Sequence, residues 1–271
     1  MSVGEKITAA RKAKGWSQEY LGDKVGVSVQ AVSAWEKDKS QPDKDHLVEL
    51  SGLLGLSLEE LMMDMTAPGF ELGSPFFSPE RMYTRVKTTA HHMGFKQTLA
   101  ALPLMREKHE GVDRDGSDVP YYVHPLTLAC HAMAMGIMDD DVLAAALLHD
   151  VIEDTDTSLE DLPVGDRVRE AVKLVSHNTY TGDKEKNKPV YYGNIAKNPL
   201  ASLIKCMDRC NNISSMATGF TKGKMIKYVK QTEEYVMPLL DVVKEVPEWN
   251  NAAWLMRYQM VTMLEAFKRL L

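Results

Sequence analysis

The apolar run from Val142 to Leu148 is followed directly by charged side chains, and this arrangement limits what the chain can fold into. His149 and Asp150 come next, and Glu153 and Asp154 follow three and four residues later. Residues at these offsets share one face of a helix, so the four side chains are expected to converge at the end of a buried helix. Because buried, unpaired charge is costly, the pattern predicts a bound metal ion. The alternative is an exposed acidic helix end, which the apolar residues before His149 disfavour.

The composition is that of an ordinary globular protein. The 271 residues are 44% hydrophobic and 26% charged, with a net charge of −6, which argues against a protein that binds nucleic acid by overall charge. The three cysteines are odd in number and lie within apolar helical patterns, which favours a reducing compartment. No apolar run approaches the roughly 20 residues of a membrane span. We therefore expect a soluble, cytoplasmic protein without membrane contact.

The chain is expected to form two all-α domains. Between residues 65 and 79 there are three prolines and two glycines, which interrupt helices. Residues 1–64 before this linker contain short amphipathic helical patterns, and residues 80–271 after it are again mostly helical in pattern. Strand patterns are scarce and short. The sequence predicts a small helical domain, a linker over 65–79 and a larger helical bundle.

Two helix starts lie close together near the N-terminus. Ser17 and Ser28 can each cap a helix, because a hydroxyl accepts hydrogen bonds from the free amides of the first turn. Gly26 lies where the first of these helices must end in a left-handed turn. The residues expected to be buried between the two crossing helices are Leu21, Val25, Val32 and Trp35. This spacing predicts a helix-turn-helix.

Residues 4–63 resemble the Xre/Cro/phage-repressor family, on Arg11, Gly15-Trp16, the two capped helices, Trp35-Glu36 and Leu47…Leu50…Leu54-Gly-Leu-Ser…Leu61. The resemblance implies a five-helix domain that binds duplex DNA through residues 17–37. The second motif helix would enter the major groove, and Gln30 has the chemistry to pair with adenine. The implied DNA-contacting residues are Gln18, Ser28, Val29, Gln30 and Ser33.

The charge of this domain leaves its use open. Residues 1–65 contain 8 Lys and Arg against 11 Asp and Glu, a net charge of −3, whereas affinity for duplex DNA comes mainly from neutralising phosphates. Ala34 is also a poor reader of base edges. A homodimer is therefore expected for any DNA binding, and protein–protein or autoregulatory use of the same fold is the alternative.

Two further positions can join His149 and Asp150. His124 precedes Pro125 at a predicted helix start, and Asp208 lies inside an apolar helical pattern. Either residue alone is more typical of a satisfied structural group. Together the four supply two imidazoles and two carboxylates, a mixture that suits Mn²⁺, Fe²⁺ or Zn²⁺ better than Ca²⁺.

The order His…His-Asp…Asp is similar to that of the HD phosphohydrolase superfamily. Within it, Tyr121-Tyr-Val-His-Pro, Ala145-Ala-Leu-Leu-His-Asp-Val-Ile-Glu-Asp-Thr and Lys205-Cys-Met-Asp-Arg-Cys-Asn-Asn resemble the hydrolase domain of the Rel/SpoT homologues over residues 95–240. This implies an HD-type bundle that removes the 3′-pyrophosphate of ppGpp and pppGpp, typically with Mn²⁺. The implied metal ligands are His124, His149, Asp150 and Asp208.

The same resemblance implies roles for five other residues. Glu153 and Asp154 match the acidic pair that handles the attacking water and the leaving-group proton, which suits carboxylates one turn beyond the metal ligands. Arg114 matches an arginine that stacks on the purine. Asn212 and Ser215 match positions that contact the nucleoside.

Some positions depart from the family pattern and leave the substrate open. Asp115 stands where the family commonly has lysine, and the loss of a cation there weakens pyrophosphate binding. The connector with Lys184, Lys186 and Lys188 either replaces this phosphate contact or is a solvated loop. Tyr228 either packs behind the bundle or reaches the nucleotide. The alternatives to (p)ppGpp hydrolysis are therefore hydrolysis of another nucleotide, such as ppApp or NADPH, and a regulator that binds a nucleotide without turnover.

The last predicted helix, from about Trp249 to Leu271, carries more apolar surface than a terminal helix usually shows. Packing against the core is the simpler interpretation. A contact between two copies of the chain is the alternative.

Overall fold

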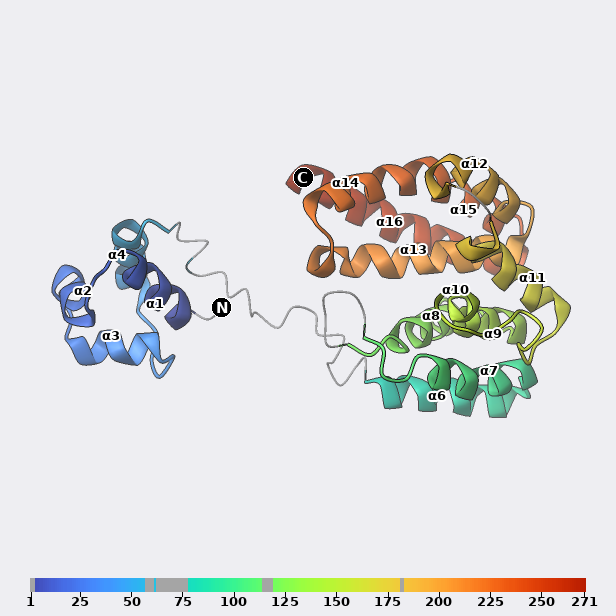
Figure 1. The fold of residues 1–271 in the computed structure, drawn as a ribbon, viewed down its shortest axis with the longest axis horizontal. Helices are drawn as coiled ribbons and strands as arrows, with labels where there is room; N and C mark the ends of the chain where they lie inside the picture. The colour runs from blue at the N-terminus through green and yellow to red at the C-terminus, as the bar shows by residue number, and fades with distance from the viewer. Residues whose placement is uncertain (1–2, 57–60, 62–77, 114–118, 181–182) are drawn as a thin grey trace. The chain divides into compact units, whose positions relative to one another are not determined.

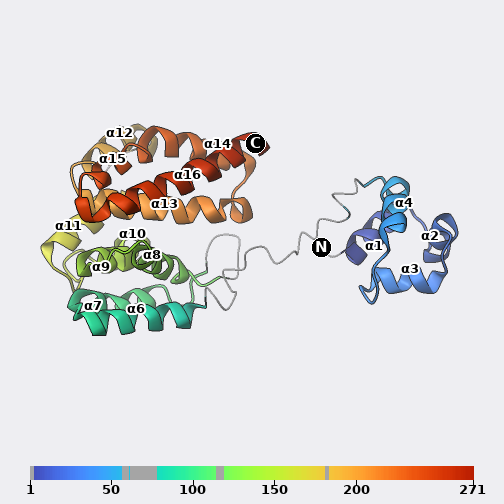
Figure 2. The same cartoon turned by 180° about the vertical axis from the view of Figure 1, so that it is seen from behind.

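A computed structural model describes residues 3–56, 61, 78–113, 119–180 and 183–271 (Figure 1, Figure 2). The backbone divides into two compact units, residues 1–71 and 72–271. The described residues contain helices and a single isolated bridge between Asp113 and Pro120, with no strand. The all-α fold class is thus confirmed. Residues 62–77 lie outside the described residues, so the linker over 65–79 stays a prediction.

The N-terminal unit has four helices among its described residues. They are α1 (Val3–Ala13), α2 (Gln18–Val25), α3 (Val29–Glu36) and α4 (Lys44–Leu54). Helices α2 and α3 pack against each other, and α1 packs on α3 and α4. The expected fifth helix stays a prediction, because residues 57–60 and 62–77 lie outside the described residues.

The helix-turn-helix is defined by local capping interactions. The hydroxyl of Ser17 accepts a hydrogen bond from the Tyr20 amide, and that of Ser28 accepts one from the Ala31 amide. Gly26 ends α2 with φ +71°, a conformation that disfavours any residue with a side chain. The predicted caps and the predicted buried residues Leu21, Val25, Val32 and Trp35 are all confirmed.

A buried ion pair ties α1 to the end of α3. Arg11 donates to both carboxylate oxygens of Glu36, at 2.5 and 3.0 Å, and also to the carbonyl of Trp16 at 2.5 Å. Gln18 donates to the same carboxylate at 2.7 Å. Burial opposes the charge of Glu36, yet its hydrogen bonds to Arg11 and Gln18 keep its pKa below the usual value.

The larger unit is a helical bundle. Its α-helices are α6 (Pro79–Met93), α7 (Lys96–Lys108), α8 (Val123–Ala134), α9 (Asp140–Leu148), α10 (Val151–Asp154), α11 (Asp166–Val175), α12 (Lys184–Ile195), α13 (Pro199–Gly219), α14 (Lys222–Gln231), α15 (Leu239–Lys244) and α16 (Asn250–Leu270). Short 3₁₀ turns cover His177–Thr179 and Pro247–Trp249, and a π-helical turn covers Thr232–Val236.

The bundle has two layers joined along α13. Helices α6 to α9 pack on one another, and α13, α15 and α16 form the other layer (Figure 1). Helix α13 contacts α8, α9 and α11, so it lies at the boundary between the layers. Helix α9 packs against α7, α8, α11 and α13. Every residue from Val142 to Leu148 is buried, as expected for a helix that is apolar on all sides.

The last helix, α16, is both a core helix and an exposed one. It buries Ala252, Met256, Met260 and Leu264 against the bundle, among others. Trp254 and Tyr258 stack on each other with ring centroids 5.6 Å apart on its exposed side. Core packing is therefore confirmed for one face, and a contact between copies through the other face stays a prediction.

Candidate functional site

The charged residues after α9 lie at a break between two helices. Helix α9 ends at Leu148, and the single turn of α10 starts at Val151. The carbonyl of Asp150 accepts hydrogen bonds from the amides of Glu153 and Asp154, at 3.1 and 2.9 Å. The sequence predicts one continuous helix here, and the structure differs because the chain turns at His149 and Asp150. The carboxylates of Asp150, Glu153 and Asp154 nevertheless line one cavity.

Four donor atoms from α8, the α9–α10 break and α13 lie close together. The Nε2 atoms of His124 and His149 are 3.1 Å apart. Asp150 Oδ2 lies 3.0 Å from His149 Nε2 and 3.5 Å from His124 Nε2. Asp208 Oδ1 lies 3.3 Å from His124 Nε2. Both histidines and Asp208 are buried.

The second nitrogen of each imidazole is fixed by a carbonyl oxygen. His124 Nδ1 lies 2.6 Å from Asn211 Oδ1, and His149 Nδ1 lies 2.8 Å from the Ala146 carbonyl oxygen. Since carbonyl oxygens only accept, each Nδ1 carries a hydrogen, and Nε2 is the atom of each ring that is left to bind a metal ion. This arrangement is typical of histidines that bind metals.

These donor atoms fit a divalent metal ion. Ligands at about 2.0–2.2 Å from an ion are separated from their neighbours by roughly 2.8–3.6 Å, and the four distances above fall within that range. His124, His149 and Asp150 each offer an atom within 4.8 Å of the other two. Asp208 contacts this group through His124 and is not one of the three residues of that set. The geometry thus supports three ligands strongly and Asp208 as a fourth at the edge.

The cluster favours a positive charge at its centre. Burial lowers the pKa of His149, but the adjacent Asp150 carboxylate outweighs it and raises this pKa to about 9. Burial also opposes the charges of Asp150 and Asp208. The pKa of Asp150 is nevertheless held well below its usual range by His149, and that of Asp208 by Lys205 and His124.

Tyr121 and the acidic pair lie beside the cluster. The Tyr121 hydroxyl donates to Asp150 Oδ2 at 2.7 Å and also contacts the Asp154 carboxyl. Partial burial of Asp154, together with the charges of Asp150 and Glu153, raises its pKa. Glu153 Oε2 accepts a hydrogen bond from the amide of His177 at 2.7 Å. Glu153 is therefore held by a backbone amide, and Asp154 is held by the phenol of Tyr121.

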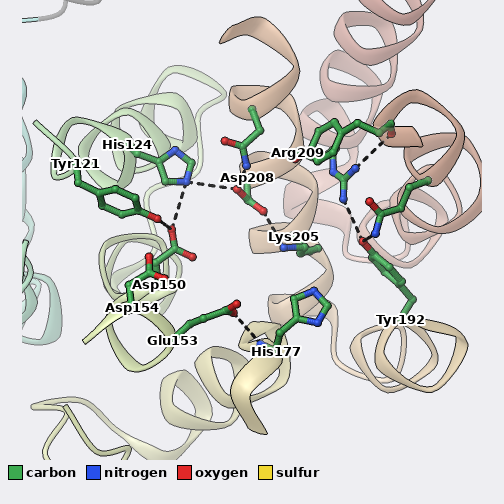
Figure 3. Close-up of a pocket in the computed structure, with 13 residues that line it drawn as sticks. Tyr121, His124, Asp150, Glu153, Asp154, His177, Tyr192, Lys205, Asp208 and Arg209 are labelled. Atoms are coloured by element: carbon green, nitrogen blue, oxygen red, sulfur yellow. Dashed lines mark hydrogen bonds and ion pairs between the residues drawn. The ribbon is translucent and has the colours of Figure 1, made fainter. Parts of the chain in front are cut away.

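A cavity of about 280 Å³ opens in front of these groups (Figure 3). One side holds the imidazole and acidic residues, and the other side holds cationic and aromatic residues. Four residues in mutual contact form the second side: Tyr192, Arg209, Tyr228 and Gln231. Lys205 lies between the two sides, because its Nζ donates to Asp208 Oδ2 at 2.8 Å.

The other predicted substrate residues differ in their positions. Asn212 lines the cavity and donates to Asp208 Oδ1 at 2.5 Å. Ser215 donates to the Asn211 carbonyl and is absent from the described cavity lining. Arg114 and Asp115 lie outside the described residues. Tyr228 lines the cavity, which favours the interpretation that it reaches a ligand.

Sequence reasoning missed most of the second side of the cavity. Lys205 and Arg209 carried one usable signal, because both are charged within the apolar helical pattern around Asp208. Tyr121 belongs to the Tyr121-Tyr-Val-His-Pro motif, but its position in the sequence indicated no role for its hydroxyl. Tyr192 and Gln231 had no signal, because their place in the cavity depends on how α12 and α14 pack.

The predicted DNA-contacting residues lie at the start of the two motif helices. Val29 and Gln30 are exposed on the first turn of α3, Ser28 caps that helix, and Ser33 is half-buried. Gln18 is hydrogen-bonded to Glu36. DNA contacts by Gln18 and by α3 stay predictions.

Comparison with known proteins separates the same two regions. A helix-turn-helix family model matches residues 7–61. Guanosine-3′,5′-bis(diphosphate) 3′-pyrophosphohydrolase MESH1 of Drosophila melanogaster is 33% identical over 123 residues, which cover 42% of this chain and 68% of that protein. This chain belongs to that pyrophosphohydrolase family.

Other members of the family extend the match. The guanosine-3′,5′-bis(diphosphate) 3′-pyrophosphohydrolase of Aquifex aeolicus is 31% identical over 160 residues, 55% of this chain and 23% of that protein. The chain thus spans about a quarter of that relative's length. A solved structure titled "A metazoan ortholog of SpoT hydrolyzes ppGpp and plays a role in starvation responses" aligns with a TM-score of 0.52 and 27% identity, over 63% of this chain and 95% of that one. The HD-type bundle expected from sequence agrees with this family.

Proposed function

We propose that residues 80–271 form a metal-dependent nucleotide 3′-pyrophosphohydrolase that acts on ppGpp and pppGpp. The observation that supports this most is the convergence of His124, His149, Asp150 and Asp208 at distances suited to one divalent ion. Membership of the pyrophosphohydrolase family supports the substrate class. The mixed imidazole and carboxylate ligands suit Mn²⁺.

In the proposed reaction, water attacks the phosphorus bound to the ribose 3′-oxygen. The new bond joins the water oxygen to phosphorus, and the bond from phosphorus to the 3′-oxygen breaks, which yields pyrophosphate and a nucleoside 5′-diphosphate or 5′-triphosphate. A divalent ion held by the four ligands would lower the pKa of the water and polarise the phosphoryl oxygen.

The acidic pair would move the two protons of this reaction. Glu153 is oriented by the His177 amide and faces the cavity, so it is placed to accept the proton of the attacking water. Asp154 has a raised pKa and a neighbouring phenol, so it is the better candidate to give a proton to the 3′-oxygen. Asn212 would contact the nucleoside from α13.

For the N-terminal unit we propose duplex DNA binding through residues 17–37. The exposed positions of Val29 and Gln30 on a capped helix, and the helix-turn-helix match over residues 7–61, support this. We propose a dimer for this function, because a single helix-turn-helix reads one half-site. None of the helices in the described part of the chain is long and apolar enough to cross a membrane.

The proposed reaction is tested by incubating the full chain with Mn²⁺ and ppGpp, pppGpp, ppApp or NADPH in parallel. We expect pyrophosphate release from the two guanosine nucleotides. Glu153→Gln is expected to lower kcat by about 10²–10⁴-fold while metal binding is retained, and the exposed Glu160→Gln is the matched control. Phosphate release from NADPH alone, or pyrophosphate from ppApp alone, would assign another substrate. Tight binding of ppGpp without turnover would indicate a sensor.

A further inference from the structure

Arg209 on α13 is a buried cation whose hydrogen-bond partners are all neutral. Its side chain is 3% exposed. It donates to Thr232 Oγ1 and to the Tyr192 hydroxyl, each at 3.1 Å, and its guanidinium lies 3.8 Å from the Tyr228 ring centroid. Its Nε has no hydrogen-bond partner. Within the part of the chain that the structure describes, no carboxylate forms an ion pair with it.

A buried charge of this kind is unfavourable unless an anion accompanies it. Arg209 also lines the cavity, opposite the metal-binding residues (Figure 3). An anionic ligand in this cavity would supply the counter-charge that the hydrogen-bond partners of Arg209 lack. Lys205 differs from Arg209 in this respect, because its ammonium already forms an ion pair with Asp208.

The hydroxyl of Tyr192 adds a hydrogen-bond donor to the same side of the cavity. Its oxygen accepts hydrogen bonds from Arg209 at 3.1 Å and from Gln231 Nε2 at 3.3 Å. A phenolic oxygen with two accepted bonds keeps its own hydrogen to donate. Tyr192 is buried and lines the cavity, and its ring stacks on Tyr235 at a centroid distance of 5.0 Å.

We propose that Tyr192 and Arg209 form an anion subsite that binds a phosphate group of the substrate other than the one that is attacked. This proposal rests on the proposed function. Three groups on this side of the cavity can donate hydrogen bonds: the guanidinium of Arg209, the hydroxyl of Tyr192 and the amide nitrogen of Gln231. A phosphate oxygen accepts several hydrogen bonds at once and supplies the missing negative charge.

The position of the subsite explains how the substrate is oriented. Asp208 and Arg209 are adjacent on α13, so the metal-binding group and the anion subsite have a fixed separation. A nucleotide with phosphates at two positions can reach both groups at once. The subsite therefore selects nucleotides that carry a second phosphate over those with only one.

Tyr192→Phe tests the subsite with a minimal change. The ring and its stacking on Tyr235 are retained, and only the donor hydroxyl is lost. Tyr191→Phe is the matched control: Tyr191 is also buried, but its hydroxyl donates to the Val175 carbonyl at 2.5 Å and it is absent from the described cavity lining.

Binding is measured by isothermal titration calorimetry of the full chain with GDP and with inorganic pyrophosphate, each in Mn²⁺. Turnover of ppGpp is measured separately. We expect Tyr192→Phe to weaken binding of GDP and to raise KM for ppGpp by about tenfold, the effect of one hydrogen bond to a charged group, with kcat changed less than twofold. Tyr191→Phe should leave both constants unchanged.

Unchanged GDP binding and KM in Tyr192→Phe would overturn the subsite, as would equal losses in Tyr192→Phe and Tyr191→Phe. A loss confined to kcat would also overturn it, because an orienting contact with the unattacked phosphate acts on binding. If wild-type protein binds GDP through Tyr192 but releases no pyrophosphate from ppGpp, the proposed function fails and the subsite stands.

Discussion

The Nε2 atoms of His124 and His149 face each other at 3.1 Å, and the opposite nitrogen of each ring is tied to a carbonyl oxygen. Two basic nitrogens at this distance repel unless a proton or a metal ion lies between them. The proposed metal ion would supply a positive charge there and join residues that are 25 positions apart in sequence. The stability of the bundle is therefore expected to depend on the ion.

Metal removal should lower the melting temperature of the larger unit. An ion present at about 100 times its Kd stabilises the native state by about 2.7 kcal/mol, which corresponds to a shift of roughly 5–10 °C for a domain of this size. We expect EDTA to cause this shift in calorimetry of the full chain, and Mn²⁺ to reverse it. His149→Ala should abolish the response. The exposed His92→Ala on α6 should keep it, and an equal response in both variants would contradict the assignment.

Tyr121→Phe should weaken the metal site without unfolding the bundle. The lost hydroxyl donates to Asp150, and groups that orient metal ligands typically contribute about 10–100-fold to metal affinity or activity. Metal affinity is measured by competition with a chromophoric chelator. The neighbouring Tyr122→Phe is the control, because Tyr122 lies against Arg106 away from the cluster. Unchanged affinity and activity in Tyr121→Phe would rule out this role.

The N-terminal unit should lose stability in acid through Glu36. Its pKa is lower in the folded state than the usual 4.5, so the Arg11 pair stabilises the fold above pH 4.5 and this stabilisation is lost as the pH falls through the folded pKa. Urea unfolding of the full chain, followed by the indole NMR signal of Trp35, measures this. Glu36→Gln should remove the acid-dependent part and lower the free energy of unfolding by roughly 1–3 kcal/mol. Glu19→Gln, on the exposed start of α2, should behave as wild type.

DNA binding should depend on Gln30 and on salt. Loss of a bidentate contact to a base costs about 1–3 kcal/mol, so Gln30→Ala is expected to weaken binding to the promoter of the protein's own gene in gel-shift titrations. The exposed Gln41→Ala lies outside the two motif helices and serves as the control. Affinity should fall steeply as salt increases. Absence of any shift at low salt would count against DNA binding.

Sequence predicted best those features that depend on neighbouring residues. The caps at Ser17, Ser28 and Gly26 follow from the chemistry of one turn, and they are present as expected. The buried run before His149 likewise identified the central helix. The break at His149 and Asp150 was not predicted, because a four-residue helix such as α10 is too short to show a hydrophobic period of its own.

Contacts between distant helices could not be predicted in the same way. Arg209 is charged within an apolar pattern, but only the packing of α12 and α14 on α13 shows that its partners are neutral. Tyr192 and Tyr191 are identical in type and adjacent in sequence, yet one hydroxyl lines the cavity and the other bonds a carbonyl. That difference arises from tertiary packing alone.

Helix α13 also restricts how this protein can evolve. Asp208, Arg209 and Asn212 lie within two turns of one 21-residue helix, and Asn212 donates a hydrogen bond to Asp208. Tyr192 and Gln231 belong to α12 and α14, which carry none of the proposed metal ligands. If the proposed function holds, new nucleotide preferences are most accessible through substitutions on those two helices, which leave the proposed metal ligands in place.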